Sequence, residues 1–96
     1  MIGLVATLRV NEGKAEQFEE VFKEVMGVVK AEEPGCLVYQ LTKSRTEANT
    51  YKVLELYEDQ AALDVHAKGD GVRAAFAKMA GCVAGRPDIE YLDAVV

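Results

Sequence analysis

One short stretch of the chain carries a carboxylate, a phenol and an imidazole. Glu55 and Tyr57 lie in a strand-like segment, a turn follows at Asp59, and His66, the only histidine, lies on the short helical segment beyond it. Histidine is the one side chain that changes charge near neutral pH when unperturbed, and a neighbouring carboxylate can orient it as a general base. These residue types and their spacing predict a proton-transfer site with His66 and Glu55 as candidate catalytic residues.

Both residues also have a purely structural interpretation. His66 could hold its helix to the sheet through a hydrogen bond to Glu55 or to a backbone carbonyl. Glu55 could pair with Arg9, Lys52 or Arg73, because an ionised carboxylate on an otherwise apolar strand face is costly without a partner. The sequence leaves both interpretations open.

Several further side chains are candidates for substrate binding. Tyr39, Tyr51 and Tyr57 occupy odd positions of two neighbouring strand-like segments. A phenol can hydrogen-bond a substrate oxygen while its ring stacks on the substrate, although such tyrosines can equally be core or interface residues. Arg73 could meet an anionic substrate or be a solvated surface residue, and Tyr91 is a weaker candidate of the same kind as the other tyrosines.

The hydrophobic pattern predicts the elements that must position these residues. Apolar residues alternate in strands and recur at helical spacing in helices. The pattern predicts strands over residues 2–10, 36–43, 50–57 and 89–96, and helices over residues 14–33, 60–68 and from 72 to the break at 81. Pro34 and Gly35 should end the first helix. Asp59 and Asp70 are the expected N-caps of the other two, and Gly69 should end the second.

The order β-α-β-β-α-α-β predicts one α+β domain over residues 1–96. The expected architecture is a ferredoxin-like split β-α-β fold, an antiparallel four-stranded sheet with helices on one face. The second face should carry aromatic and aliphatic side chains, which would make it a pocket lining or an interface. Two copies could close their sheets into a shared barrel, so we expect a homodimer, a dimeric α/β barrel.

Composition and charge restrict the partners and the location. The 96 residues carry a net charge of −5, so we expect neither nucleic acid nor an anionic membrane surface as a partner. An apolar run of about 20 residues and a basic n-region are both missing, which predicts a cytoplasmic protein. Cys36 and Cys82 are too few and too far apart for a disulfide framework or a zinc site. No phosphate-binding glycine loop is present, and we predict neither a metal nor a cofactor.

A set of residues carries a family resemblance, which together with the element order covers nearly the whole chain: Glu33-Pro34-Gly35-Cys36, Tyr39, Tyr51, Glu55, Tyr57, Asp59, Ala62, Leu63 and His66. On these residues the chain resembles the antibiotic biosynthesis monooxygenase family, dimeric α+β barrels that include cofactor-free quinol and anthrone oxygenases. The resemblance implies monooxygenation, without a cofactor, of a small quinol or polycyclic aromatic substrate. His66, oriented by Glu55, would remove a phenolic proton, and the electron-rich anion would then react with molecular oxygen.

Similar barrels also have other functions, and a fold does not settle the chemistry. The main alternative is a non-catalytic dimeric barrel that binds a small ligand or takes part in a stress response. Isomerisation of a small phosphorylated sugar would need cationic groups, and lysine and arginine are scarce near the predicted pocket. Haem-degrading members resemble one another in an asparagine on strand one and a tryptophan on strand three. This chain has Val5-Ala6-Thr7 at the first place and no tryptophan.

Overall fold

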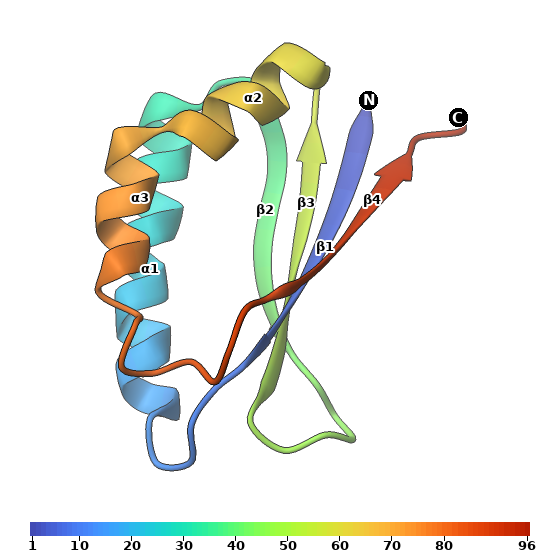
Figure 1. Cartoon of the computed structure of the whole chain (residues 1–96). Coiled ribbons are helices and arrows are strands. Elements are labelled where there is room, and N and C mark those ends of the chain that lie inside the picture. Colours follow the sequence, from blue (N-terminus) through green and yellow to red (C-terminus); the bar gives the residue numbers. More distant parts are fainter.

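The computed structural model describes all 96 residues, and its sheet is covered by helices on one face (Figure 1). The elements are β1 (Ile2–Arg9), α1 (Ala15–Glu32), β2 (Cys36–Lys43), β3 (Thr50–Tyr57), α2 (Gln60–Lys68), α3 (Asp70–Ala77) and β4 (Asp88–Asp93). The strands are ordered β2-β3-β1-β4, and every neighbouring pair is antiparallel. This confirms the predicted α+β class and ferredoxin-like sheet. None of the helices has the length and apolarity that crossing a membrane requires.

The ends of several elements differ from the prediction for local reasons. The last strand ends at Asp93 instead of residue 96, because Asp93 pairs with Ile2, the first residue of β1, and β1 offers no further strand partner. The third helix begins at Asp70, so Asp70 lies in the first turn, where a carboxylate suits the helix dipole, and Gly69 is the N-cap. The predicted cap of α2 is confirmed, since Asp59 Oδ1 accepts a hydrogen bond of 2.9 Å from the Ala62 amide.

The core lies between the inner face of the sheet and the helices. Along α1 the buried residues Phe18, Phe22, Val25 and Val29 recur every three or four positions, so they form one stripe that faces the sheet. On β3 the buried residues alternate with exposed or partly buried ones from Tyr51 to Tyr57. That alternation directs Glu55 into the covered layer together with its apolar neighbours.

The outer face of the sheet differs from the prediction in one respect, because it carries no aromatic side chain. Tyr39 and Leu4 both pair with Glu55, and Tyr91 pairs with Leu4, so the strand tyrosines share the helix-covered face. The large apolar residues of the outer face are aliphatic: Val5, Val38, Leu54, Leu56 and Leu92. The expectation of aromatics on this face is therefore wrong, and only its aliphatic part is confirmed.

A close approach of backbone to helix fixes the position of α2. A Cβ atom placed on Gly35, in the turn between α1 and β2, would lie 2.6 Å from the Cβ of Ala62 on α2. The turn and the helix therefore touch at a point where only glycine fits. Because α2 also carries His66, this contact helps to set the height of the imidazole above the sheet.

We expect Gly35→Ala to lower the free energy of unfolding by roughly 1–3 kcal/mol, the usual cost of overpacking. The added methyl group forces α2 away from the turn, and the double variant with Ala62→Gly should lose less than the sum of the two single variants, because the opposing atom is gone. Urea denaturation of the single and double variants measures the coupling. Gly27→Ala is the control, because a Cβ at Gly27 meets nothing within 4 Å. Losses of Gly35→Ala and Ala62→Gly that simply add in the double variant would contradict the proposed contact.

Candidate functional site

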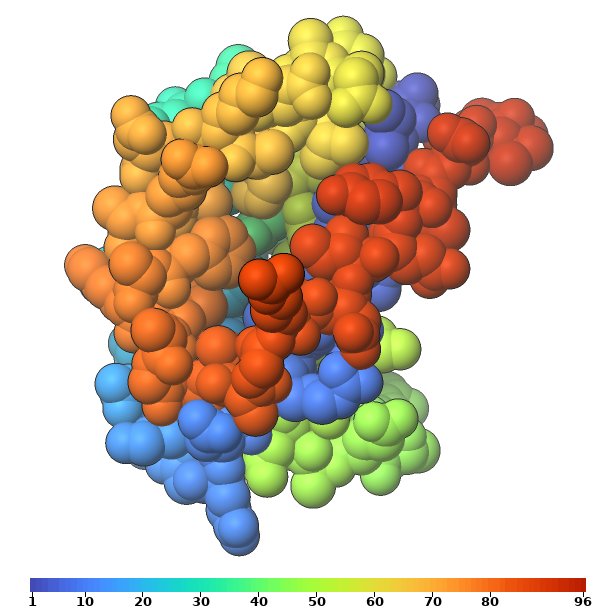
Figure 2. Space-filling view, in the orientation of Figure 1, coloured from blue at the N-terminus to red at the C-terminus, as the bar shows by residue number.

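A cavity of about 410 Å³ lies between the inner face of the sheet and the helices α2 and α3. It is visible as a hollow between the orange helices and the red strand β4 in the space-filling view (Figure 2). Of its 16 lining residues 13 are hydrophobic, so the few polar groups decide how a ligand would be oriented. A volume of this size is within the range of roughly 300–1,000 Å³ that small-molecule sites occupy.

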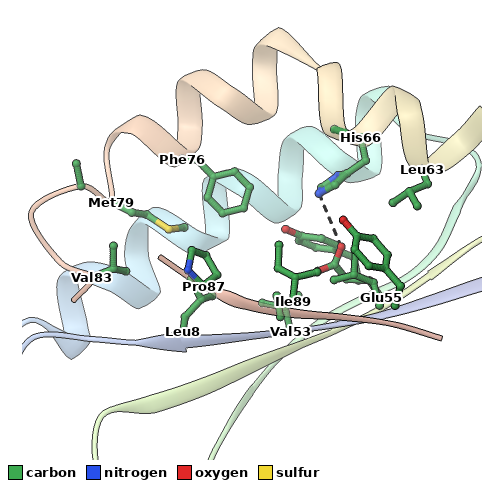
Figure 3. Close-up of a pocket in the computed structure, with 16 residues that line it drawn as sticks. Leu8, Val53, Glu55, Leu63, His66, Phe76, Met79, Val83, Pro87 and Ile89 are labelled. Atoms are coloured by element: carbon green, nitrogen blue, oxygen red, sulfur yellow. Dashed lines mark ion pairs between the residues drawn. The ribbon is translucent and has the colours of Figure 1, made fainter. Parts of the chain in front are cut away.

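The polar groups of the cavity lie at one end. Glu55 and His66 face each other there, while Leu8, Met79 and Val83 lie toward the other end (Figure 3). A ligand that matches this distribution has an apolar body and one polar group at its edge.

His66 projects from α2 toward the sheet and has carboxylates on both sides. Its Nδ1 lies 2.9 Å and 3.1 Å from the two carboxylate oxygens of Glu33, and its Nε2 lies 3.7 Å from Glu55 Oε1. The first contact is a hydrogen bond and the second, at 3.7 Å, is too long for one. The side chain of His66 is 13% exposed, so the imidazole is largely shielded from water.

Glu55 is held on the inner face of β3 without a basic partner other than His66. Tyr57 donates a hydrogen bond of 2.5 Å from its hydroxyl to Glu55 Oε1. Of the three cations considered as partners from the sequence, Arg9 pairs with Asp88 at 2.7 Å, Lys52 is exposed on the outer face and Arg73 is exposed on α3. The alternative in which Glu55 pairs with one of those cations is therefore wrong.

Burial is the main influence on the titration of Glu55. Loss of water around the carboxylate raises its pKa above the ordinary value of 4.5; the Tyr57 hydrogen bond and nearby His66 oppose the rise, and the charge of Glu33 adds to it. Glu55 therefore keeps its proton to a higher pH than an exposed glutamate does.

Two of the predicted tyrosines lie beside the imidazole. The rings of Tyr39 and Tyr57 lie 5.5 Å and 5.4 Å from that of His66. Burial raises the pKa of Tyr39, with further contributions from the charges of Glu55 and Glu33. Burial also raises the pKa of Tyr57, and its hydrogen bond to Glu55 adds to the effect. Both phenols thus stay protonated near neutral pH, and that of Tyr57 donates its hydrogen bond to Glu55.

Of the other predicted binding residues, Tyr51 and Arg73 are not brought to the cavity. Tyr51 is buried against Phe18, with ring centroids 4.8 Å apart, and its hydroxyl donates to Glu19. Burial, followed by that hydrogen bond, raises the pKa of Tyr51 to about 12. Arg73 is exposed and does not line the cavity. Tyr91 does line it from β4, although the residue is 63% exposed.

Two parts of the site are absent from the sequence-based prediction. The apolar wall formed by α3 and the segment before β4 is one of them, with Phe76, Met79 and Pro87 among its residues. The other is Glu33, which binds His66. Glu33 lies directly before Pro34 at the C-terminal end of a helix, where a carboxylate is unfavourable. That position is the signal that could have indicated a special role.

Cys36 lies close to this site but is not a nucleophile at neutral pH. Its thiol donates to the Val38 carbonyl at 3.4 Å. Burial raises the pKa of Cys36 to about 11, and the charges of Glu33 and Glu55 act in the same direction. No group of three histidine, cysteine or carboxylate side chains in the chain is placed so that it could hold a metal ion.

The fold and the cavity define a class of small ferredoxin-like α+β proteins with an apolar site between sheet and helices. The family model for antibiotic biosynthesis monooxygenase matches residues 1–78. Because the match covers most of the chain, the protein belongs to the antibiotic biosynthesis monooxygenase family.

Solved structures agree with this assignment. A candidate antibiotic biosynthesis monooxygenase from Caulobacter crescentus is 57% identical, with a TM-score of 0.94 over 99% of this chain and 90% of that one. A Shewanella oneidensis protein is 28% identical, with a TM-score of 0.83 over 95% and 87% of the two chains. A candidate monooxygenase of the same family from Nitrosomonas europaea is 15% identical and has a TM-score of 0.88 over both whole chains, which shows the shared fold alone. No protein with a curated functional description matches.

We expect Glu55→Gln to stabilise the protein relative to the parent chain, and increasingly so as pH rises above 4.5. Below 4.5 Glu55 is protonated in both the folded and the unfolded chain; above it the unfolded chain ionises first, so the parent loses stability until pH passes the raised pKa. The loss is about 1.4 kcal/mol per unit of pKa elevation, and glutamine does not titrate.

Urea denaturation of both proteins across this pH window measures the difference. Glu12→Gln, at an exposed turn, is the control for a change of net charge. If the difference in unfolding free energy between Glu55→Gln and the parent shrinks as pH rises, the folded state favours the ionised carboxylate, and the predicted direction is wrong.

Proposed function

We propose that the chain is a cofactor-independent monooxygenase that acts on a small quinol or polycyclic aromatic substrate by base-assisted reaction with molecular oxygen. One observation carries the proposal: a cavity with a buried imidazole at one end and apolar walls elsewhere, in a chain of the antibiotic biosynthesis monooxygenase family. The flat apolar body of such a substrate matches the walls, and its hydroxyl matches the polar end.

In the proposed reaction His66 is the general base. Its Nε2 accepts the proton of the substrate hydroxyl, and the resulting anion is electron-rich enough to reduce oxygen directly. For an anthrone, one oxygen atom replaces the two hydrogens of the reacting methylene as a carbonyl, and those hydrogens leave with the second oxygen atom as water. The substrate supplies every electron, so no external reductant is needed.

The charge of the site favours a neutral substrate over a phosphorylated sugar. The ionisable side chains that line the cavity are Glu55, His66 and the phenols of Tyr39 and Tyr91, and neither lysine nor arginine is among them. A phosphate group would have to lose its water beside carboxylates, which is costly. The alternative of a non-catalytic binding barrel predicts a cavity filled by the chain's own side chains, and the open volume beside His66 supports the enzyme instead.

The proposal includes a homodimer that uses the outer face of the sheet. Val38, Leu54 and Leu92 are 44%, 41% and 44% exposed, although large aliphatic side chains usually lie in cores. They belong to three different strands of one face, so they form a patch rather than isolated exposed residues. Patches of this kind mark interaction surfaces, and a second copy of the same sheet would cover it.

We expect His66→Gln to lower kcat/KM for oxygen consumption with a panel of hydroquinones and anthrones by roughly 10²–10⁴-fold, the contribution of a general base. Asp64→Asn, on the exposed side of the same helix, is the matched control and should keep the parental rate. Unchanged oxygen consumption by the His66→Gln chain, with the parent active, would rule out His66 as the base.

We expect Leu54→Glu to convert the dimer into a monomer, because it places a charge in the middle of the aliphatic patch. Sedimentation velocity at micromolar concentration distinguishes the two states. Val65→Glu is the control, since Val65 is a similarly exposed aliphatic residue on α2 instead of the sheet. A parent chain that sediments as a monomer would contradict the proposed assembly.

A further inference from the structure

Glu33 is in a position that is unfavourable for a carboxylate. It caps the C-terminal end of α1, where the helix dipole repels negative charge, and its side chain is only 4% exposed. No lysine or arginine pairs with Glu33, and both of its carboxylate oxygens lie within hydrogen-bond distance of Nδ1 of His66. A buried charge of this kind needs a compensating contact, and His66 supplies it.

We propose that Glu33 is a positioning residue that holds a proton on Nδ1 of His66, so that Nε2 presents its lone pair to the cavity. The inference rests on the proposed role of His66 as a base. Glu33 itself does not line the cavity, so it acts through the imidazole and not on the substrate.

The geometry decides between two competing carboxylates. A neutral imidazole has one N–H, and either nitrogen can carry it. Both oxygens of Glu33 lie within hydrogen-bond distance of Nδ1, whereas Glu55 Oε1 is 3.7 Å from Nε2 and already accepts from Tyr57. The proton therefore belongs on Nδ1, and without Glu33 the nearby Glu55 would draw it to Nε2.

The charge of Glu33 has a second effect after proton transfer. The imidazolium then lies in an apolar, largely water-free layer, where a negative charge at hydrogen-bond distance stabilises it far more than in water. The ionisable groups that face the ring come from two strands and the end of one helix: Tyr39 on β2, Glu55 and Tyr57 on β3, and Glu33 after α1. Only Glu33 makes a hydrogen bond to it.

The tautomer can be observed directly, because His66 is the only histidine in the chain. Nitrogen-15 NMR of the imidazole at a pH where it is neutral distinguishes protonated Nδ1 from protonated Nε2. We expect an Nδ1–H tautomer in the parent chain and a shift toward Nε2–H in Glu33→Gln. Glu55→Gln should leave Nδ1–H unchanged, and Glu32→Gln, the same charge change at the exposed neighbouring residue, should do so too.

The rate gives an independent readout. We expect Glu33→Gln to lower kcat/KM by roughly 10–100-fold, the usual effect of losing a group that orients an imidazole. Glu33→Asp keeps the charge and should restore part of the lost rate.

The outcomes separate this inference from the proposed function. An Nδ1–H tautomer that depends on Glu33, in a chain that oxidises none of the substrates, would support the positioning role and refute the oxygenase. If Glu33→Gln lowers only the melting temperature and leaves the tautomer unchanged, Glu33 is a structural link between α1 and α2 and the inference is wrong. Should Glu33→Gln fail to fold, the tautomer in Glu33→Asp and in the parent chain decides the question.

Discussion

The burial of ionisable groups beneath the helices is the constraint on which the rest of the site depends. Glu55 points into the apolar layer because strand alternation leaves it no other direction, and a carboxylate there needs polar partners. Tyr57 supplies a hydrogen bond from the same strand, and His66 supplies a nearby base from α2. His66 in turn brings Glu33, so a single inward position on β3 is linked to the ends of two helices. Truncating one of these side chains would leave its partners buried and unsatisfied, whereas an amide in place of a carboxylate still accepts a hydrogen bond.

The apolar side chains packed around Glu55, His66 and Glu33 limit how far these polar groups can move. Phe22 stacks on Tyr39 with ring centroids 5.7 Å apart and an interplanar angle of 6°, so the α1 stripe that builds the core also holds a cavity wall. The turn after α1 touches α2 where Gly35 meets Ala62. Gly35 lies two residues after Glu33, the C-cap of α1. The contact that sets the position of α2 therefore lies next to the carboxylate that binds its histidine, and packing and electrostatics specify the same arrangement.

Sequence patterns predict the parts of this arrangement that depend on local geometry. Alternation over residues 50–57 correctly places Glu55 and Tyr57 on one face, and the Asp59 cap correctly starts the helix that carries His66. Glu33 could not be found in this way, because it meets His66 across 33 residues of chain. The aromatic content of the outer face was wrongly predicted for a related reason: which face of each strand turns toward the helices depends on the register between β2, β3, β1 and β4. Tyr51 looks equivalent to Tyr57 by period alone, yet it lies toward the far end of β3, beside Phe18 and Glu19.

The raised pKa of Glu55 reconciles the site with the chemistry proposed for it. A fully ionised Glu55 would repel the substrate anion formed when His66 takes its proton, and Glu33 already provides one negative charge to balance the imidazolium. Burial raises the pKa of Glu55, which favours its neutral form and so acts against that repulsion. The environments of the two carboxylates thus differ: Glu33 is hydrogen-bonded to the imidazole, whereas burial disfavours the charged form of Glu55. In the proposed reaction the ion pair of imidazolium and substrate anion would form in an apolar cavity whose lining includes neither lysine nor arginine.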